Sequence, residues 1–217
     1  MSSLDSPAPS GAPDARIPRL LYFPWAGRAG AIRDCLRLGS VDFDDVRLPY
    51  SEYQRVRDAG DLPFHLLPVL ELEDGTRIGQ SNTILRWAAR RAGLVPTDAV
   101  EALRVESVID MVEDYAARLS VTIREPDAAV RSHQREGLAT RWMPELYRNL
   151  SGCLERSGSG WLVGSALSAA DLKAWHLLEK LLDGSLDGMP TDALAAHPAL
   201  HAWMRRVGDA RPAEPKP

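Results

Sequence analysis

The sequence predicts a small α/β domain followed by an all-helical domain. Short apolar runs typical of β-strands alternate with helical spacing in the first part of the chain, whereas the pattern is helical throughout from Asp98 onward. The 217 residues are enough for two small domains. We expect a disordered arm over residues 1–17, the α/β domain over 18–93 and the helical domain over 98–210, with a linker between the two domains.

The composition is that of an ordinary globular protein, with 45% hydrophobic and 26% charged residues. The formal net charge of -4 gives no electrostatic reason to approach a phosphate backbone, so no nucleic-acid partner is expected. No apolar run approaches the ~20 residues that span a bilayer, so no membrane partner is expected either.

The first residues are rich in Ser, Pro, Ala and Asp and lack the apolar core of a signal peptide. The two cysteines, Cys35 and Cys153, show no CxxC or paired His spacing. This usage indicates a reducing compartment and no structural metal, and we expect a cytoplasmic protein.

The α/β domain begins with a strand and a helix. Residues 19–23 form a short apolar run closed by a proline, which predicts a strand that ends at a loop. Residues 28–38 place Ile32 and Leu36 four apart and stop at Gly39, as in a helix with a terminating glycine.

Three more strands and a second helix follow. Residues 41–48 alternate apolar and acidic side chains, and residues 68–72 and 76–78 flank an Asp-Gly turn that predicts a hairpin. Residues 81–91 predict a helix with Ser81 as its N-cap and a glycine beyond its end. The order βαβββα is the thioredoxin-like arrangement.

The helical domain starts with a long amphipathic helix. Its apolar residues fall at i, i+3, i+4 and i+7 spacing and are Val105, Val108, Ile109, Val112, Tyr115, Ala116 and Leu119. Further helical segments are expected over residues 127–155, 169–182 and 198–207.

Several motifs occur in an order and spacing that is typical of one family. They are Tyr22-Phe23 followed by Gly27-Arg28, Leu62-Pro-Phe64 followed by Leu67-Pro68-Val69-Leu70, Gln80-Ser81-Asn82, Trp161-Leu-Val-Gly164, and the capping box Ser168-Ala-Ala-Asp171. In these motifs the chain resembles cytosolic glutathione S-transferases of the tyrosine type from about Leu20 to Pro212. The closest resemblance is to the sigma class, which includes glutathione-dependent prostaglandin D synthases.

The resemblance implies that Tyr22 activates the thiol of the co-substrate glutathione. A thiol has a pKa of about 8.5, and a hydroxyl that donates a hydrogen bond to the sulfur favours the thiolate. Arg28, six residues later, matches the family's active-site arginine and adds positive charge. The alternative readings are a half-buried tyrosine that caps the sheet and an exposed helix arginine.

The family pattern also implies the residues that hold glutathione. Leu67 would pair through its backbone with the cysteinyl part, next to a cis bond to Pro68. The γ-glutamyl end would lie at a set of three residues: Gln80, Ser81 and, from the partner subunit of a homodimer, Asp114. Tyr53 and Arg57 match the residues that grip the glycine end, although either could be an ordinary surface residue. Leu66 departs from the pattern, because the family usually has lysine or glutamine there.

Five residues beside the expected thiol site and on the long helix could line a pocket for the hydrophobic electrophile: Phe23, Trp25, Tyr115, Arg118 and Val121. The acidic residues Asp110, Glu113 and Asp114 share one helix face, for which a solvated surface is the default explanation. This cluster resembles the divalent-cation site of the haematopoietic prostaglandin D synthase branch, but no metal is expected here.

The expected function is the conjugation of glutathione to a hydrophobic electrophile. Two alternatives remain at this stage. A glutathione-dependent isomerase or biosynthetic enzyme would use the same residues, and a non-catalytic binding protein of this fold would be consistent with Leu66.

Overall fold

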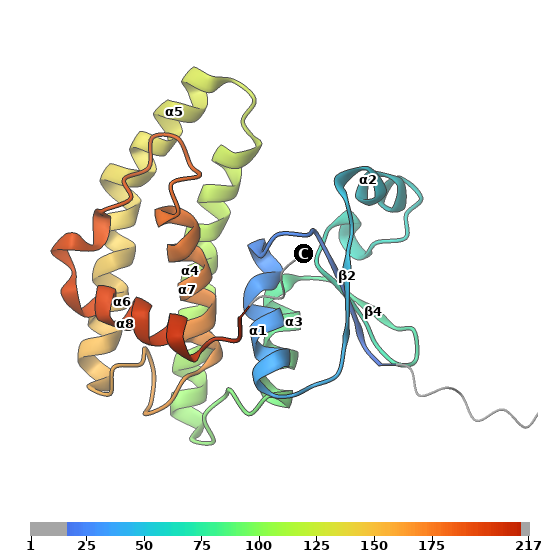
Figure 1. Ribbon diagram of the computed structural model, residues 1–217, viewed down its shortest axis with the longest axis horizontal. Coiled ribbons are helices and arrows are strands. Elements are labelled where there is room, and N and C mark those ends of the chain that lie inside the picture. Colours follow the sequence, from blue (N-terminus) through green and yellow to red (C-terminus); the bar gives the residue numbers. More distant parts are fainter. Residues whose placement is uncertain (1–16, 214–217) are drawn as a thin grey trace, which may run out of the picture.

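The computed structural model describes residues 17–213, so the predicted arm lies outside the described residues except for Ile17. Figure 1 shows a sheet with its helices at one end of the molecule and a set of longer helices at the other. This is the predicted fold class, a thioredoxin-like part followed by a helical part. No helix within residues 17–213 is long and apolar enough to cross a bilayer.

The sheet has four strands in the order β2-β1-β3-β4. They are β1 (Arg19–Tyr22), β2 (Asp44–Arg47), β3 (Val69–Glu71) and β4 (Arg77–Ile78). β1 runs parallel to β2 and antiparallel to β3, and β3 pairs antiparallel with β4. The order places β1 in the interior of the sheet, where its last residue, Tyr22, pairs with Arg47 of β2 just beyond the end of the pairing with β3.

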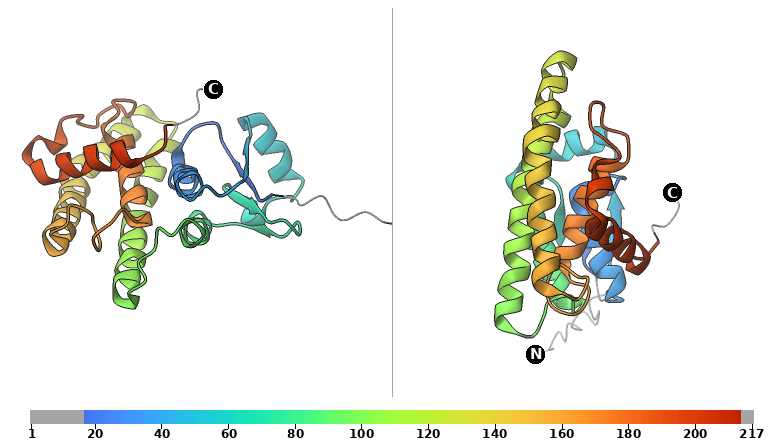
Figure 2. Two further views of the ribbon diagram at one scale, coloured as in Figure 1. Left: turned by 60° about the horizontal axis from the view of Figure 1, so that its bottom comes forward. Right: turned by 90° about the vertical axis from the view of Figure 1, so that its left-hand side faces the viewer.

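Helices cover both faces of the sheet. α1 (Gly30–Leu38) and α3 (Ser81–Arg91) lie between the sheet and the helical part, where Leu20 and Leu70 pack into the main core. α2 (Tyr50–Asp58) lies on the opposite face, as the left view of Figure 2 shows. That face carries a smaller core of Leu21, Leu62 and Val69.

α2 was not predicted, and β2 is shorter than expected. None of the residues of α2 is buried, and only Tyr53 and Val56 pack against the smaller core. A helix with so few apolar contacts shows little periodicity in its hydrophobic residues, which explains why its sequence resembles a polar loop. Its formation depends on tertiary contact and on the extended backbone of Pro49 at its N-cap.

Two glycines predicted to end or turn an element have the expected backbone conformation. The hairpin turns at Asp74-Gly75, where Gly75 has a φ of +85° and the Asp74 carboxylate accepts from the Thr76 N–H. At the end of α3, Gly93 has a φ of +68°, and the N–H of Leu94 bonds back to the carbonyl of Ala89. This is the hydrogen bond of a Schellman motif.

One predicted cap is wrong. Gln80, with a φ of +73°, is the N-cap of α3, and Ser81 is the first helical residue. Ser81 is buried. The positive φ at Gln80 turns the chain sharply into the helix, which moves the cap one residue earlier than the Ser preference implies.

The helical part contains five α-helices: α4 (Ala99–Arg124), α5 (Ala128–Gly137), α6 (Met143–Ser157), α7 (Ala169–Leu182) and α8 (Pro198–Ala210). α4 and α6 run side by side in Figures 1 and 2, and the predicted apolar face of α4 is largely buried between its neighbours. The segment expected over 127–155 is α5 and α6 joined by a π-helical turn at Leu138–Trp142. The capping box of α7 is present as predicted.

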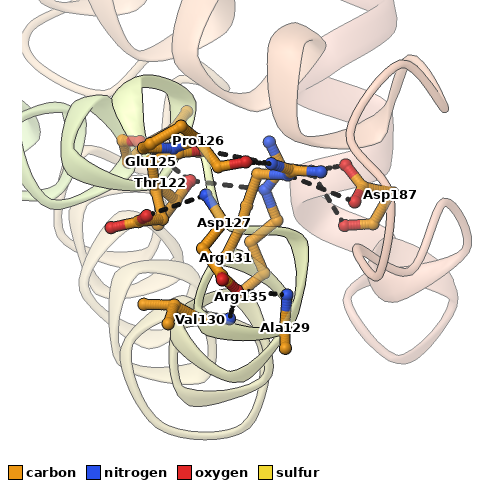
Figure 3. Close-up of polar contacts among 10 residues, drawn as sticks. Thr122, Glu125, Pro126, Asp127, Ala129, Val130, Arg131, Arg135 and Asp187 are labelled. Atoms are coloured by element: carbon orange, nitrogen blue, oxygen red, sulfur yellow. Dashed lines mark hydrogen bonds and ion pairs between the residues drawn. The ribbon is translucent and has the colours of Figure 1, made fainter.

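A long connection after α7 is tied back to the α4–α5 turn by arginines, as Figure 3 shows. The buried Arg135 pairs with the carboxylate of Asp187 and donates to its carbonyl at 3.0 Å. Arg131 donates to the carbonyl of Glu125 at 3.0 Å and lies 3.5 Å from the Asp187 carboxylate. These contacts order a segment that has little regular structure of its own.

Candidate active site

Tyr22 ends β1 and is 6% exposed. Its hydroxyl oxygen accepts a hydrogen bond from the backbone N–H of Arg28 at 3.0 Å. A phenol oxygen can accept one bond and still donate its own proton, so the Tyr22 O–H is available to a further acceptor. The bond also fixes the hydroxyl at the start of the helical segment that leads into α1.

Burial raises the pKa of Tyr22 above its ordinary value, although the Arg28 N–H bond and the charges of Arg28, Arg33 and Arg124 act in the opposite direction. The phenol is therefore protonated at neutral pH. A protonated phenol is a hydrogen-bond donor, which is the form that can stabilise an anion.

The guanidinium of Arg28 turns toward the helical part of the molecule. It forms an ion pair with Glu113 of α4 and donates to the Ser120 hydroxyl at 3.2 Å. The other oxygen of Glu113 accepts from Lys173 of α7 at 2.6 Å. Glu113, predicted only as part of an acidic face, thus links the turn before α1 to the helical part.

A cluster of aromatic rings lies beside Tyr22. The rings of Phe23 and Trp25 stack with centroids 4.6 Å apart, and Tyr53 meets Phe23 edge-on at 5.1 Å. Tyr50, which the sequence analysis did not identify, lies 6.3 Å from Phe23. Trp25 is 54% exposed, so this cluster presents an aromatic surface to solvent next to the Tyr22 hydroxyl.

The loop that carries these rings is held by a fully buried arginine. Arg33 of α1 donates to the carbonyls of Phe23 and Trp25 at 3.0 and 2.8 Å, and its Nε pairs with Asp45 at 2.8 Å. An arginine inside a predicted helix gives no signal of such a role, so the sequence analysis missed it.

Six of the residues predicted to hold glutathione belong to the thioredoxin-like part, whereas Asp114 lies on α4; the six are Tyr53, Arg57, Leu67, Pro68, Gln80 and Ser81. The Leu67–Pro68 bond is cis, as predicted. The Tyr53 hydroxyl donates to the carbonyl of His65 at 3.4 Å, which ties α2 to the segment before the cis bond. Arg57 lies over the Tyr53 ring at 5.6 Å and pairs with the exposed Asp58. Their roles toward a ligand stay predictions.

The predicted residues of α4 are not all directed toward Tyr22. The Tyr115 hydroxyl accepts from Asn149 of α6 at 3.2 Å, and Arg118 lies over the Trp142 ring at 4.1 Å. Both therefore face the helical interior and the π-helical turn. Val121 and Asp114 are exposed.

The face of α4 that meets the Tyr22 region instead carries Glu113 and Ser120, which contact Arg28, and Arg124, whose charge acts on Tyr22. Spacings of seven and four residues put these three on one side of the helix. The α4 residues predicted for the electrophile pocket lie on other faces of the helix, and their role in that pocket stays a prediction.

The helical part carries a groove that lies apart from the predicted site. The groove has a volume of about 820 Å³, lies between α4, α6 and the loop that follows α6, and contains none of the predicted site residues. Within residues 17–213, no group of three or more His, Cys, Asp or Glu side chains could hold a metal ion. Asp110, from the predicted acidic face, pairs with Arg86 of α3 at 2.6 Å.

Comparison with known proteins gives one consistent result. Residues 113–212 match the family model for the glutathione S-transferase C-terminal domain. Glutathione S-transferase 2 of Caenorhabditis elegans is 32% identical over 173 residues, which are 76% of this chain and 88% of that protein. Haematopoietic prostaglandin D synthase of Mus musculus is 28% identical over 195 residues, 86% of this chain and 94% of that protein.

The fold has a solved counterpart in the prostaglandin synthase D of Nilaparvata lugens. The two structures superpose with a TM-score of 0.78 at 25% identity, over 89% of this chain and 93% of that chain. The resemblance inferred from the motifs is confirmed. The chain belongs to the glutathione S-transferase family.

Proposed function

We propose that this protein conjugates the thiolate of glutathione to a hydrophobic electrophile, with Tyr22 as the residue that stabilises the thiolate. The observation that carries the proposal is the hydrogen bond from the Arg28 N–H to the Tyr22 oxygen, which leaves the phenol proton free to donate. Family membership supports glutathione as the co-substrate.

The chemistry needs the thiol proton to leave before the new bond forms. Free thiols have a pKa of about 8.5, so most glutathione is protonated at neutral pH. In the proposed complex the Tyr22 O–H donates to the sulfur, Arg28 adds positive charge, and the thiol proton passes to solvent. The thiolate then attacks the electrophilic carbon with its lone pair. In a substitution the leaving group departs with the electron pair of its bond, and in an addition the π bond breaks and its electron pair takes up a proton from solvent.

The peptide would lie across the thioredoxin-like part, along the cis bond and the turn into α3. Gln80 and Ser81 stand at the N-terminus of α3, whose free N–H groups favour a carboxylate. Leu67 would contribute its backbone, and Tyr53 and Arg57 the contacts at the glycine end. The exposed rings of Trp25 and Tyr50, with the half-buried ring of Phe23, would form the apolar surface for the electrophile.

We further propose that the protein works as a two-fold dimer in which Asp114 reaches the glutathione of the partner subunit. Asp114 is exposed on α4, and the same helix exposes Val100 and Leu103. A C2 dimer uses one patch twice, so each site would gain one carboxylate.

Asp114→Ala should weaken glutathione binding several-fold without loss of helicity, because one charge-assisted contact disappears. Equilibrium dialysis with glutathione and sedimentation velocity measure the two quantities. A monomer that binds glutathione with wild-type affinity would exclude the shared site.

The test of the main proposal is Tyr22→Phe, which keeps the ring and its packing. A hydrogen bond to a charged group contributes about 1.5 to 3 kcal/mol, so the pKa of the bound thiol should rise by roughly one to two units. Turnover at neutral pH should fall at least about tenfold, with little change in glutathione affinity and with recovery at high pH. Thiolate absorbance against pH and the pH profile of kcat/KM are the measurements, and an unshifted thiol pKa would remove Tyr22 from this role.

A second reaction class fits the same residues. Several of the proteins matched are named as prostaglandin D synthases, which favours an isomerase in which glutathione adds and leaves again. Product analysis separates the two, because conjugation consumes glutathione and isomerisation regenerates it. A non-catalytic binding protein would retain glutathione and turn over neither class of substrate, and the exposed Leu66 motivates that comparison.

A further inference from the structure

A buried lysine lies behind Arg28. Lys173 lies on α7, two residues after the capping-box residue Asp171, and is 8% exposed. Its Nζ donates to Glu113 Oε2 at 2.6 Å. Burial lowers the pKa of Lys173 against the attraction of Glu113. A buried ammonium group is costly without a partner, and Glu113 is the carboxylate that it contacts.

Glu113 divides its two oxygens between two cations. Oε1 pairs with Arg28 and Oε2 with Lys173. Burial alone would raise the pKa of Glu113, but the two cations outweigh it and lower that pKa, so the carboxylate is ionised at neutral pH. With both cations charged, Arg28, Glu113 and Lys173 together carry one net positive charge.

The Arg28 member of this group lies next to Tyr22, and its charge acts on the Tyr22 hydroxyl. Arg28 bonds the Tyr22 oxygen through its backbone and Glu113 through its side chain, so one residue connects the hydroxyl with the three-membered ion group. The group is partly shielded from water, since all three side chains are buried or half-buried. Screening by solvent is weaker there than at an exposed surface.

We propose that Lys173 is a positioning residue for the transferase reaction: by occupying the second oxygen of Glu113, it prevents that carboxylate from neutralising Arg28 and keeps a net positive charge beside the forming thiolate. The inference rests on the proposed function. At an effective dielectric of about 20 and a separation of about 10 Å, one unit charge shifts a pKa by roughly one unit. That is enough to change the thiolate fraction at neutral pH several-fold.

The alternative is that Lys173 only neutralises Glu113 at the contact between helices. The two roles predict different directions for the shifts in the pKa of bound glutathione. Lys173→Met removes a positive charge, so the pKa of bound glutathione should rise by about one unit. Glu113→Gln removes the negative charge, so the same pKa should fall. A purely structural role predicts that both variants disturb Arg28 and move the pKa in the same direction.

Two more variants sharpen the test. The double variant Lys173→Met with Glu113→Gln has the wild-type net charge, so its bound thiol should titrate near the wild-type value, and removing a buried ion pair together is tolerated better than removing one partner. If Lys173→Met alone fails to fold, Glu113→Gln and the double variant still decide the question. Lys180→Met is the matched control, because Lys180 is a less buried lysine on the same helix and pairs with Asp183.

The measurements are thiolate absorbance against pH in the saturated enzyme and the pH profile of kcat/KM. Opposite shifts in the single variants, their cancellation in the double variant and no shift in Lys180→Met support the proposal. Equal or same-direction shifts overturn it, even where Tyr22→Phe still raises the thiol pKa. A wild-type enzyme that does not lower the thiol pKa at all overturns the proposed function as well, and the two failures are thereby distinguished.

Discussion

Gly27 lies against the Tyr22 hydroxyl with a φ of +42°, and a Cβ at this position would stand 2.6 Å from the hydroxyl oxygen. Two requirements therefore coincide at one residue. The backbone needs a conformation that L side chains rarely adopt, and the phenol needs the space that a methyl group would fill. The close approach also brings the following N–H, that of Arg28, into hydrogen-bond range of the same oxygen.

Gly27→Ala should displace the Tyr22 hydroxyl and weaken its bond to the Arg28 N–H. We expect the pKa of bound glutathione to rise toward the value in the Tyr22→Phe variant and turnover at neutral pH to fall about tenfold, since the same donor is lost. Steady-state kinetics and the thiolate titration report both effects.

Gly75→Ala is the control for backbone strain alone. Gly75 has a φ of +85° in the β3–β4 turn, with nothing within 4 Å of an added Cβ. It should lose about 1 kcal/mol of stability and keep wild-type turnover. Equal loss of activity in both variants would mean that Gly27 acts through general stability.

At the scale of single residues, the sequence predicts the groups that stand in local motifs. Tyr22, Arg28 and the cis bond at Pro68 are each identified from a few neighbouring letters. Lys173 and Arg33 are not, because their partners Glu113, Phe23 and Trp25 come from other elements and no local pattern marks a buried cation. Tyr115 contacts Asn149 of α6, a neighbour that spacing alone does not reveal, and its role in an electrophile pocket stays a prediction.

At the scale of elements, predictions hold where periodicity and caps agree. α3 and α7 have the predicted bounds, each with a strong terminal signal in the Schellman glycine or the capping box. α2 was missed because it buries no residue. The break between α5 and α6 was also missed, since a π-helical turn keeps helical residues and adds only one to the register.

The segment after α7 shows the same limit for a long connection. Its position is set by Arg135 and Arg131, which reach Asp187 from α5 (Figure 3). These pairs join residues about fifty positions apart in the chain, and local sequence carries no information on them. An arginine on a helix is usually exposed, so its burial here is visible only in the folded chain.

At the scale of the whole molecule, the two parts are joined by charged groups in a buried contact. Asp34 of α1 is fully buried and accepts from His176 Nε2 of α7 at 2.8 Å and from Arg211 Nε after α8 at 2.5 Å. Gly30, one turn earlier, lets the His176 ring approach, because a Cβ there would stand 2.5 Å from it. The same interface carries Arg28 and Glu113, so its integrity bears on the site.

Asp34→Asn should therefore loosen the joint between the two parts. Burial acts to raise the pKa of Asp34, but the hydrogen bonds and charges of His176 and Arg211 outweigh it and lower that pKa below its ordinary value. Removing one partner of a buried charged group costs about 3 to 5 kcal/mol. For a chain of this size, Tm should fall by roughly 10 °C at neutral pH.

The pH dependence of that loss follows from its sign. A carboxyl whose pKa is lower in the folded state stabilises the fold above its unfolded pKa of about 3.9, and this contribution disappears as the pH falls through the folded pKa. The stability difference between the wild type and Asp34→Asn should thus be full at neutral pH and shrink below about pH 4. Urea unfolding at a series of pH values measures it, with Asp209→Asn as the exposed control. A difference that stays constant into acid would show that the carboxylate charge is not the source of the loss, because the wild type would then keep its advantage over the amide after Asp34 has been protonated.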